Sequence, residues 1–303
     1  MKASLTFLGT GQGSLVIGKN HLSSGGIVLQ VDENQFWLDP GPNALKNAAE
    51  NNINIRATTA ILVSHAHLGH SNDTNAIIDA MTYSGFDKKG VLIASKSVIN
   101  GSNDFPPVLL PYSKTLLERY IAMEAGQMVG INDIEIKALK TKHSDQDAIG
   151  FKFFTSNFIL AYSSDTKFAP ELIDEYKGSN ILILNVPSIK DPKANLCIED
   201  AIKIIKEVKP KLAIITHFGT DMVKGDPLSL TRNIQMAAGV QVITAKDSMV
   251  INPLSYSVSQ RIIPSKQEEK KQELPEVKPS DEAEQKVLES DILLKDIIKE
   301  EQK

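Results

Sequence analysis

Three histidines fall within six residues, in the segment Ser64-His65-Ala66-His67-Leu68-Gly69-His70. The chain has only six histidines in 303 residues, so their grouping is unlike a random distribution. In an extended segment, residues two apart point to the same side, so His65 and His67 can bind one ion, while His70 reaches it from the start of the next helix. Imidazole nitrogen is a common zinc ligand. The pattern predicts a metal site, and the alternative is three unrelated surface or helix-capping histidines.

Further ligand-type residues come directly after apolar stretches that are typical of strands. His143 follows residues 134–139, Asp165 follows 158–162, and His217 follows 212–215. Ligands gather beyond the carboxyl ends of strands in open sheets, so we expect these three side chains to lie near the histidine triplet. His21 is left without a role.

The elements that must position these residues alternate along the chain. Short apolar runs predict strands at 5–8, 27–31, 35–38, 60–63, 134–139, 150–154, 158–162, 181–184, 212–215, 240–244 and 249–251. Helical spacing predicts one helix capped by Asn72 and another over 198–208, which Pro210 ends. This arrangement indicates a layered protein of the α/β or α+β class.

Other catalytic chemistries have little support in the sequence. Residues 13–20 nearly form a phosphate-binding loop, but Asn20 replaces the Ser or Thr that would hold magnesium, and a strand is expected to follow instead of a helix. The glycines at 9, 11 and 13 have the wrong spacing for a dinucleotide site. There is no GxSxG motif, and Cys197, the single cysteine, is expected on an apolar helix face.

Composition divides the chain into two parts. Residues 264–303 contain eight lysines and twelve acidic residues, which accounts for the net charge of −4, so residues 1–263 are neutral. A neutral body does not attract nucleic acid by its overall charge. The chain has no long apolar run and no signal-peptide pattern, so we expect a cytoplasmic protein without a membrane span.

The acidic tail has no aromatic residue and is rich in Lys, Glu, Gln and Pro, as in a disordered linker. After Ser280 the apolar residues return at helical spacing, from Val287 to Ile298. Residues 281–303 are therefore predicted to form an amphipathic helix. It either docks on its own body or provides contacts for a partner or a second copy of the chain.

The order of the motifs LTFLGTG, FWLDPGP, HAHLGH, KHSD, YSSDT, THFG and AKDSMVI resembles the metallo-β-lactamase-fold hydrolase superfamily over residues 1–255. Within it, the phrases DPGP and KHSD are similar to the ribonuclease Z-like branch. The resemblance implies a four-layer αβ/βα sandwich with one or two metal ions at one edge, between the sheets. Zinc is the expected metal, and manganese and iron suit the same ligands.

The resemblance also implies roles for particular residues. His65, His67 and His143 would bind the first metal, His70 and His217 the second, and Asp165 would bridge the two. Asp39 would orient the histidine turn by hydrogen bonds without binding metal.

One position departs from the superfamily pattern HxHxDH, because Gly69 stands where the pattern has Asp. That Asp normally binds the second metal. Asp73, Asp145 or Asp147 could replace it, although for Asp73 a role at the start of a helix is the preferred interpretation.

The expected function is metal-dependent hydrolysis of a phosphodiester or a related ester by zinc-bound hydroxide. Asp165 follows His143 by only 22 positions, which leaves no room for the inserted arm by which ribonuclease Z binds transfer RNA. Transfer RNA is therefore not the expected substrate, and the variable stretch 84–130 should shape the pocket mouth. The alternative, based on Gly69, is a metal-binding scaffold or ligand sensor without catalysis.

Overall fold

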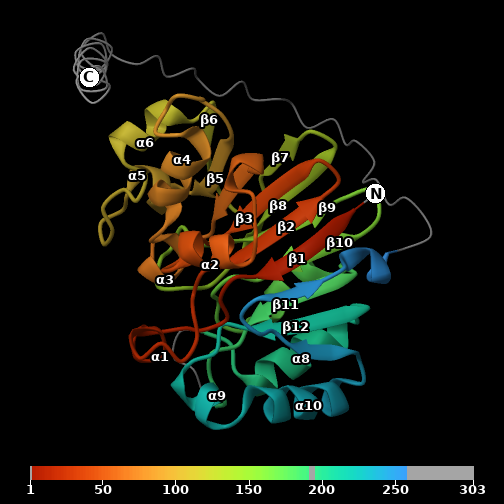
Figure 1. The fold of residues 1–303 in the computed structure, drawn as a ribbon. Coiled ribbons are helices and arrows are strands. Elements are labelled where there is room, and N and C mark those ends of the chain that lie inside the picture. Colours follow the sequence, from red (N-terminus) through yellow and green to blue (C-terminus); the bar gives the residue numbers. More distant parts are fainter. Residues whose placement is uncertain (1, 191–194, 258–303) are drawn as a thin grey trace, which may run out of the picture. The chain divides into compact units, whose positions relative to one another are not determined.

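Two seven-stranded β-sheets form the centre of the chain in a computed structural model that describes residues 2–190 and 195–257 (Figure 1). The predicted linker and helix in residues 264–303 lie outside the described residues. None of the described helices is long and apolar enough to cross a membrane.

Strands from both halves of the chain contribute to each sheet. In spatial order, the first sheet contains β14 (Met249–Ile251), β1 (Ala3–Phe7), β2 (Ile27–Val31), β3 (Asn34–Leu38), β4 (Ala60–Val63), β5 (Val91–Ser95) and β6 (Arg119–Met123). The second sheet contains, also in spatial order, β13 (Val242–Thr244), β12 (Leu212–Thr216), β11 (Ile181–Asn185), β10 (Ile159–Tyr162), β9 (Ile149–Phe154), β8 (Ile134–Lys140) and β7 (Met128–Ile131).

Both sheets change from antiparallel to parallel pairing along their width. The first sheet is antiparallel from β14 to β3 and parallel from β3 to β6. The second is antiparallel from β7 to β10 and parallel from β10 to β13. Several strands therefore end at the same sheet edges, and their following loops are brought together there.

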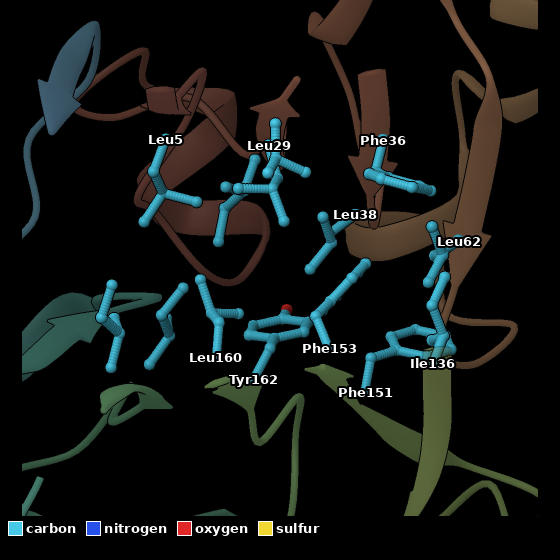
Figure 2. Packing of buried hydrophobic residues seen from close by; sticks show 14 of the residues in the cluster. Leu5, Leu29, Phe36, Leu38, Leu62, Ile136, Phe151, Phe153, Leu160 and Tyr162 are labelled. Carbon is cyan, nitrogen blue, oxygen red and sulfur yellow. The ribbon is translucent and has the colours of Figure 1, made fainter. Parts of the chain in front are cut away.

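The inner faces of the two sheets pack against each other through apolar side chains. Figure 2 shows Leu29, Phe36 and Leu38 of the first sheet opposite Phe153 and Tyr162 of the second, all of them buried. Side chains alternate between faces along a strand, so Trp37, between Phe36 and Leu38, points to the opposite face. Strand β3 is buried on both faces because helices cover the outer one.

Helices form the two outer layers. The α-helices of the described residues are α1 (Ser14–Gly18), α2 (Ala44–Glu50), α3 (Leu68–Ser71), α4 (Thr74–Thr82), α5 (Lys96–Asn100), α6 (Pro111–Leu116), α7 (Ile173–Tyr176), α8 (Ile198–Val208), α9 (Thr220–Lys224) and α10 (Pro227–Ala238). Buried residues of α2, α4 and α5 pack on the first sheet, and those of α7, α8 and α10 pack on the second. The predicted four-layer αβ/βα sandwich is confirmed.

The segment after the glycine cluster, for which the sequence predicts no helix, is helical. It forms the short helix α1, whose first turn is closed by the amide groups of Val16 and Ile17, which donate to the Gly13 carbonyl. Val16 is buried, whereas Leu15 is 61% exposed. Only one of the three consecutive apolar residues of α1 is buried, so the run lacks the spacing of apolar positions that predicts a helix.

The predicted cap of the helix after the histidine triplet is also wrong by one residue. Asn72 ends α3, and Asp73 occupies the N-cap position of α4. The side chain of Asp73 does not cap α4 but accepts a hydrogen bond from the backbone amide of Leu45 at 3.2 Å. The helix itself buries Ile77 and Ile78 as predicted.

Cys197 lies just before α8, not on its apolar face. Its backbone amide donates to Asp200 at 3.2 Å, so the residue begins the helix. Residues 84–130, predicted as a variable pocket region, contain two parallel strands of the first sheet as well, β5 and β6. Of this stretch, the loop around Phe105 lines a cavity.

Candidate metal centre

Four strand ends bring the predicted ligands to one place. His65 follows β4, His143 follows β8, Asp165 follows β10 and His217 follows β12. His65, His67 and His143 each offer one ring nitrogen, and these three atoms lie within 4.8 Å of one another, so the side chains could hold one ion. His143 Nε2 is 3.1 Å from His67 Nδ1.

A second group of ligand atoms adjoins the first. His65, His70 and Asp165 also offer atoms within 4.8 Å of one another. The Nε2 atoms of His70 and His217 are 3.1 Å apart and lie 3.4 and 3.3 Å from the carboxylate oxygens of Asp165. Two ligands bound to zinc at ~2.0–2.1 Å in a tetrahedron are roughly 3.3 Å apart, so this spacing suits a common ion.

The orphaned Nε2 atom of His65 provides a test of whether a metal fits. This histidine is fully buried, and its Nε2 has no hydrogen-bond partner. Its Nδ1 lies 2.9 Å from the hydroxyl of Ser64, which donates its own proton to Asp39 at 2.7 Å and so must accept from Nδ1. Nε2 of the neutral ring therefore carries the free lone pair. A metal ion satisfies this buried acceptor, so the residues fit the group.

Asp39 holds the histidine turn together from below. Its Oδ1 accepts from the backbone amide of Ser64 at 2.7 Å. Its Oδ2 accepts from the Ser64 hydroxyl, and it lies 2.8 Å from both His70 Nδ1 and the Tyr162 hydroxyl. The predicted hydrogen bonds between Asp39 and the histidine turn are present. A donor at Nδ1 leaves Nε2 of His70 directed at Asp165 and His217.

Asp145 supports the opposite side of the turn, a role that the sequence did not predict. Its Oδ2 accepts from the backbone amide of Ala66 at 3.0 Å and from the Ser97 hydroxyl at 2.6 Å. It therefore positions the residue between His65 and His67. The sequence signal for this residue is its place two positions after His143, which predicts only a substitute metal ligand.

Burial and neighbouring charges set the protonation of the cluster. Burial and the nearby His70 hold the pKa of His65 well below its ordinary value. Burial and His143 lower the pKa of His67. Burial opposes a charge on His70 as well, but the carboxylates of Asp165 and Asp39 outweigh it and raise its pKa to about 10. Without metal, the buried Asp165 is thus paired with a charged imidazole.

The backbone is constrained where the site residues emerge. Asp39, Ser164 and His217 have positive φ angles of 52°, 54° and 66°, which are unusual for residues other than glycine. Next to His217, the amide of Phe218 donates to the Thr10 carbonyl at 2.7 Å. The amide of Gln12 in turn donates to the Phe218 carbonyl at 2.9 Å. The glycine-rich segment after β1 therefore holds the backbone beside His217 in place.

Gly69 lies between the histidines in α3, and its position is open. A Cβ atom built there has no heavy atom within 4 Å, and the φ angle is not positive. By contrast, a Cβ atom on Gly41 would lie 2.0 Å from the Gly69 carbonyl oxygen. Only glycine at position 41 therefore lets the DPGP turn approach α3 this closely. Among the described residues, the ligand groups do not include Asp73, Asp145 or Asp147. Asp73 is instead bonded to the amide of Leu45, so the structure does not support its role as a substitute ligand.

The chain is similar in sequence to known proteins over most of its length. The model of the β-lactamase superfamily domain matches residues 34–218. The uncharacterized protein MJ1374 of Methanocaldococcus jannaschii is 32% identical over 267 residues, which cover 87% of this chain and 100% of the relative.

Solved structures share the fold at low sequence identity. The metallo-β-lactamase fold protein YhfI from Bacillus subtilis is 17% identical, with a TM-score of 0.70 over 83% of this chain and 99% of that chain. A diphosphatase from the PhnP family is 18% identical, with a TM-score of 0.63 over 83% and 98%. A long-form RNase Z from yeast is 16% identical, with a TM-score of 0.65 over 83% and 42%.

The motif order therefore predicted the family correctly. The matched domain includes all of the candidate ligands, from His65 to His217, and the fold places them together. Family and cluster together support a divalent-metal-dependent hydrolase. The chain belongs to the β-lactamase superfamily and has the metallo-β-lactamase fold.

Proposed function

We propose that the protein is a zinc-dependent hydrolase that cleaves a compact phosphodiester. The observation that carries the proposal is the fully buried Nε2 of His65, which has no hydrogen-bond partner. His65 offers a ligand atom within 4.8 Å of those of four other side chains, His67, His70, His143 and Asp165. A buried acceptor without a partner is costly unless an ion or a ligand satisfies it.

The metal ligands in this proposal are His65, His67 and His143 at one position and His70 and His217 at the other, with Asp165 between them. Neutral imidazoles and a carboxylate suit zinc, and they also suit manganese and iron. A bound ion of this kind supplies a Lewis acid that acidifies water and polarises a phosphoryl oxygen.

The chain's own residues orient and fix the ligand groups. Asp39 and Ser64 hold the rings of His70 and His65 with Nε2 toward the site. Asn185 donates to Asp165 Oδ1 at 2.8 Å and fixes that carboxylate. These contacts hold the site in one geometry before substrate arrives, which is what makes such groups effective in catalysis.

The compact substrate is favoured by the length of the chain between His143 and Asp165. The 21 residues between them contain only the rest of the loop after β8, β9 and β10, with no inserted arm. A substrate as large as transfer RNA has no dedicated element in this segment. The fold shared with a PhnP-family diphosphatase supports chemistry on a phosphoryl ester.

The test combines metal analysis and turnover. We expect zinc-loaded protein to hydrolyse bis(4-nitrophenyl) phosphate, with little action on the monoester 4-nitrophenyl phosphate. Loss of the rate on chelation and its return with zinc would support the proposal. A fully zinc-loaded protein that leaves phosphodiesters intact would contradict it.

Gly69 favours one alternative, a metal-binding scaffold or ligand sensor without turnover, because the second position lacks a carboxylate there. The scaffold alternative predicts that the protein binds metal at full occupancy but does not hydrolyse phosphodiesters, thioesters or lactones. It also predicts that Gly69→Asp does not introduce such hydrolysis.

A further inference from the structure

Two cavities meet at the metal-ligand cluster. Each has a volume of about 450 Å³, and both are lined by His67 and Leu68. One extends over Asp165 and His217, while the other extends away from them toward Phe105. Leu68, which lines both cavities, is 71% exposed. A substrate whose reacting centre is at the cluster thus has room for a separate group on each side.

The second of these, the Phe105 cavity, has an apolar wall. The wall consists of Phe105, Pro106, Pro107 and Val108. The Phe105 ring lies edge-on to the His67 ring, with centroids 5.1 Å apart and an interplanar angle of 84°. An aromatic wall in direct contact with a ligand histidine places an apolar group of the substrate beside the reacting centre.

Hydrogen bonds hold this wall in place. Asn75 of α4 donates from its side-chain nitrogen to the Val108 carbonyl at 2.9 Å and accepts from the Leu110 amide at 3.1 Å. At the other end, the Ser102 amide donates to the Phe105 carbonyl at 2.7 Å. Gly101 has a φ of 76°, and a Cβ there would lie 2.8 Å from a Pro107 ring carbon, so the loop closes tightly on it. The wall is therefore formed before a ligand binds.

The charges of the two cavities limit the ligand. Within residues 2–190 and 195–257, no lysine or arginine lines either cavity. Polyphosphates and nucleic-acid strands are recognised largely by such cations. The ionisable lining groups are instead the histidines and Asp165 of the cluster itself, so the favoured substrate carries its negative charge at the reacting centre alone.

We propose that the Phe105 cavity binds the aromatic or similarly flat apolar alcohol group of a singly charged ester, with Phe105 as the specificity-determining residue. This inference rests on the proposed function, because it assumes that the bound ester is the substrate. The binding of the apolar group itself can be tested without measuring hydrolysis. Aromatic contacts of this type change affinity by about tenfold.

The experiment compares two inert, singly charged diesters, diphenyl phosphate and dimethyl phosphate, by calorimetric titration of the zinc-loaded full chain. We expect diphenyl phosphate to bind at least about tenfold more tightly. Phe105→Ala should remove most of this preference and leave dimethyl phosphate binding unchanged, while Phe105→Leu should keep an intermediate preference. The control Phe86→Ala changes a phenylalanine that is 77% exposed and lines neither cavity, so its preference should equal that of the unaltered protein.

Equal binding of the two diesters, or an equal loss for both in Phe105→Ala, would overturn the inference. Its failure is distinguishable from that of the proposed function. Selective binding of diphenyl phosphate without any hydrolysis refutes only the reaction. Hydrolysis of bis(4-nitrophenyl) phosphate with an unchanged KM in Phe105→Ala refutes only the Phe105 cavity as the binding site.

Discussion

Asp39 lies at the end of β3 with its Oδ2 2.8 Å from Nδ1 of His70, 31 residues later in the chain. The same oxygen accepts from Ser64, which in turn orients His65. One carboxylate therefore fixes two histidines, His70 of the second group of ligand atoms and His65, which belongs to both groups.

Asp39→Asn should weaken zinc binding by about 10–100-fold, because loss of an orienting carboxylate has that effect at metal sites. The new amide also places N–H groups against donors that need an acceptor. Competition with a chromophoric chelator measures the affinity. Asp32→Asn, in the exposed turn between β2 and β3, is the matched control and should bind zinc normally. Unaltered affinity in Asp39→Asn would show that the ring orientation does not depend on Asp39.

His67→Ala should reduce bound zinc and abolish hydrolysis, because it removes one of the three nitrogens of the first ligand group. His67 is only half-buried, so the variant is expected to fold. Elemental analysis of protein purified without added chelator measures zinc per chain. His21→Ala removes an exposed histidine outside both groups and should leave the content unchanged. Equal zinc in the two variants would rule out this assignment.

Gly69→Asp should add affinity for a second ion. The position is open, has no positive φ, and borders the same cavity as His70, Asp165 and His217. A carboxylate there adds a ligand that suits zinc. Calorimetric titration with zinc should show that the second equivalent binds more tightly to Gly69→Asp than to the unaltered protein. Gly130→Asp places the same charge at another open glycine, on β7 and outside both ligand groups, and controls for added charge. Identical titrations for both variants would contradict the expectation.

The pKa of His70, raised to about 10, makes the stability of the metal-free protein depend on pH. Since an unfolded histidine has a pKa of ~6.5, the stabilisation is fully present below about pH 6.5 and is lost as pH rises toward 10. Burial lowers the pKa of Lys152 to about 8, and deprotonation of this lysine acts in the opposite direction above that pH.

Urea unfolding of zinc-free protein between pH 6.5 and 9.5 measures this effect. His70→Asn removes the histidine and retains Lys152, so the difference between the two proteins should shrink as pH rises. A difference that stays constant over this range would show that His70 is neutral throughout.

Much of the fold could be predicted from local sequence. Alternating or continuous apolar runs located most strands of both sheets and the helix α8, because burial selects apolar residues at the period of each element. The same reasoning missed α1, because only one of its three apolar residues is buried. It also failed for Cys197, because the exact start of a helix depends on hydrogen bonds such as that to Asp200.

By itself the sequence determined the residue types and their order, which were enough to identify the family and the six candidate ligands. Only the tertiary structure decided how they interact: that Asp73 bonds to Leu45, that Asp145 supports Ala66, and that Phe105 lies against His67. The physical reason is that each of these contacts joins residues 28 to 79 positions apart, so it depends on where separate strands and loops end in space. Local propensity carries no information about such distances.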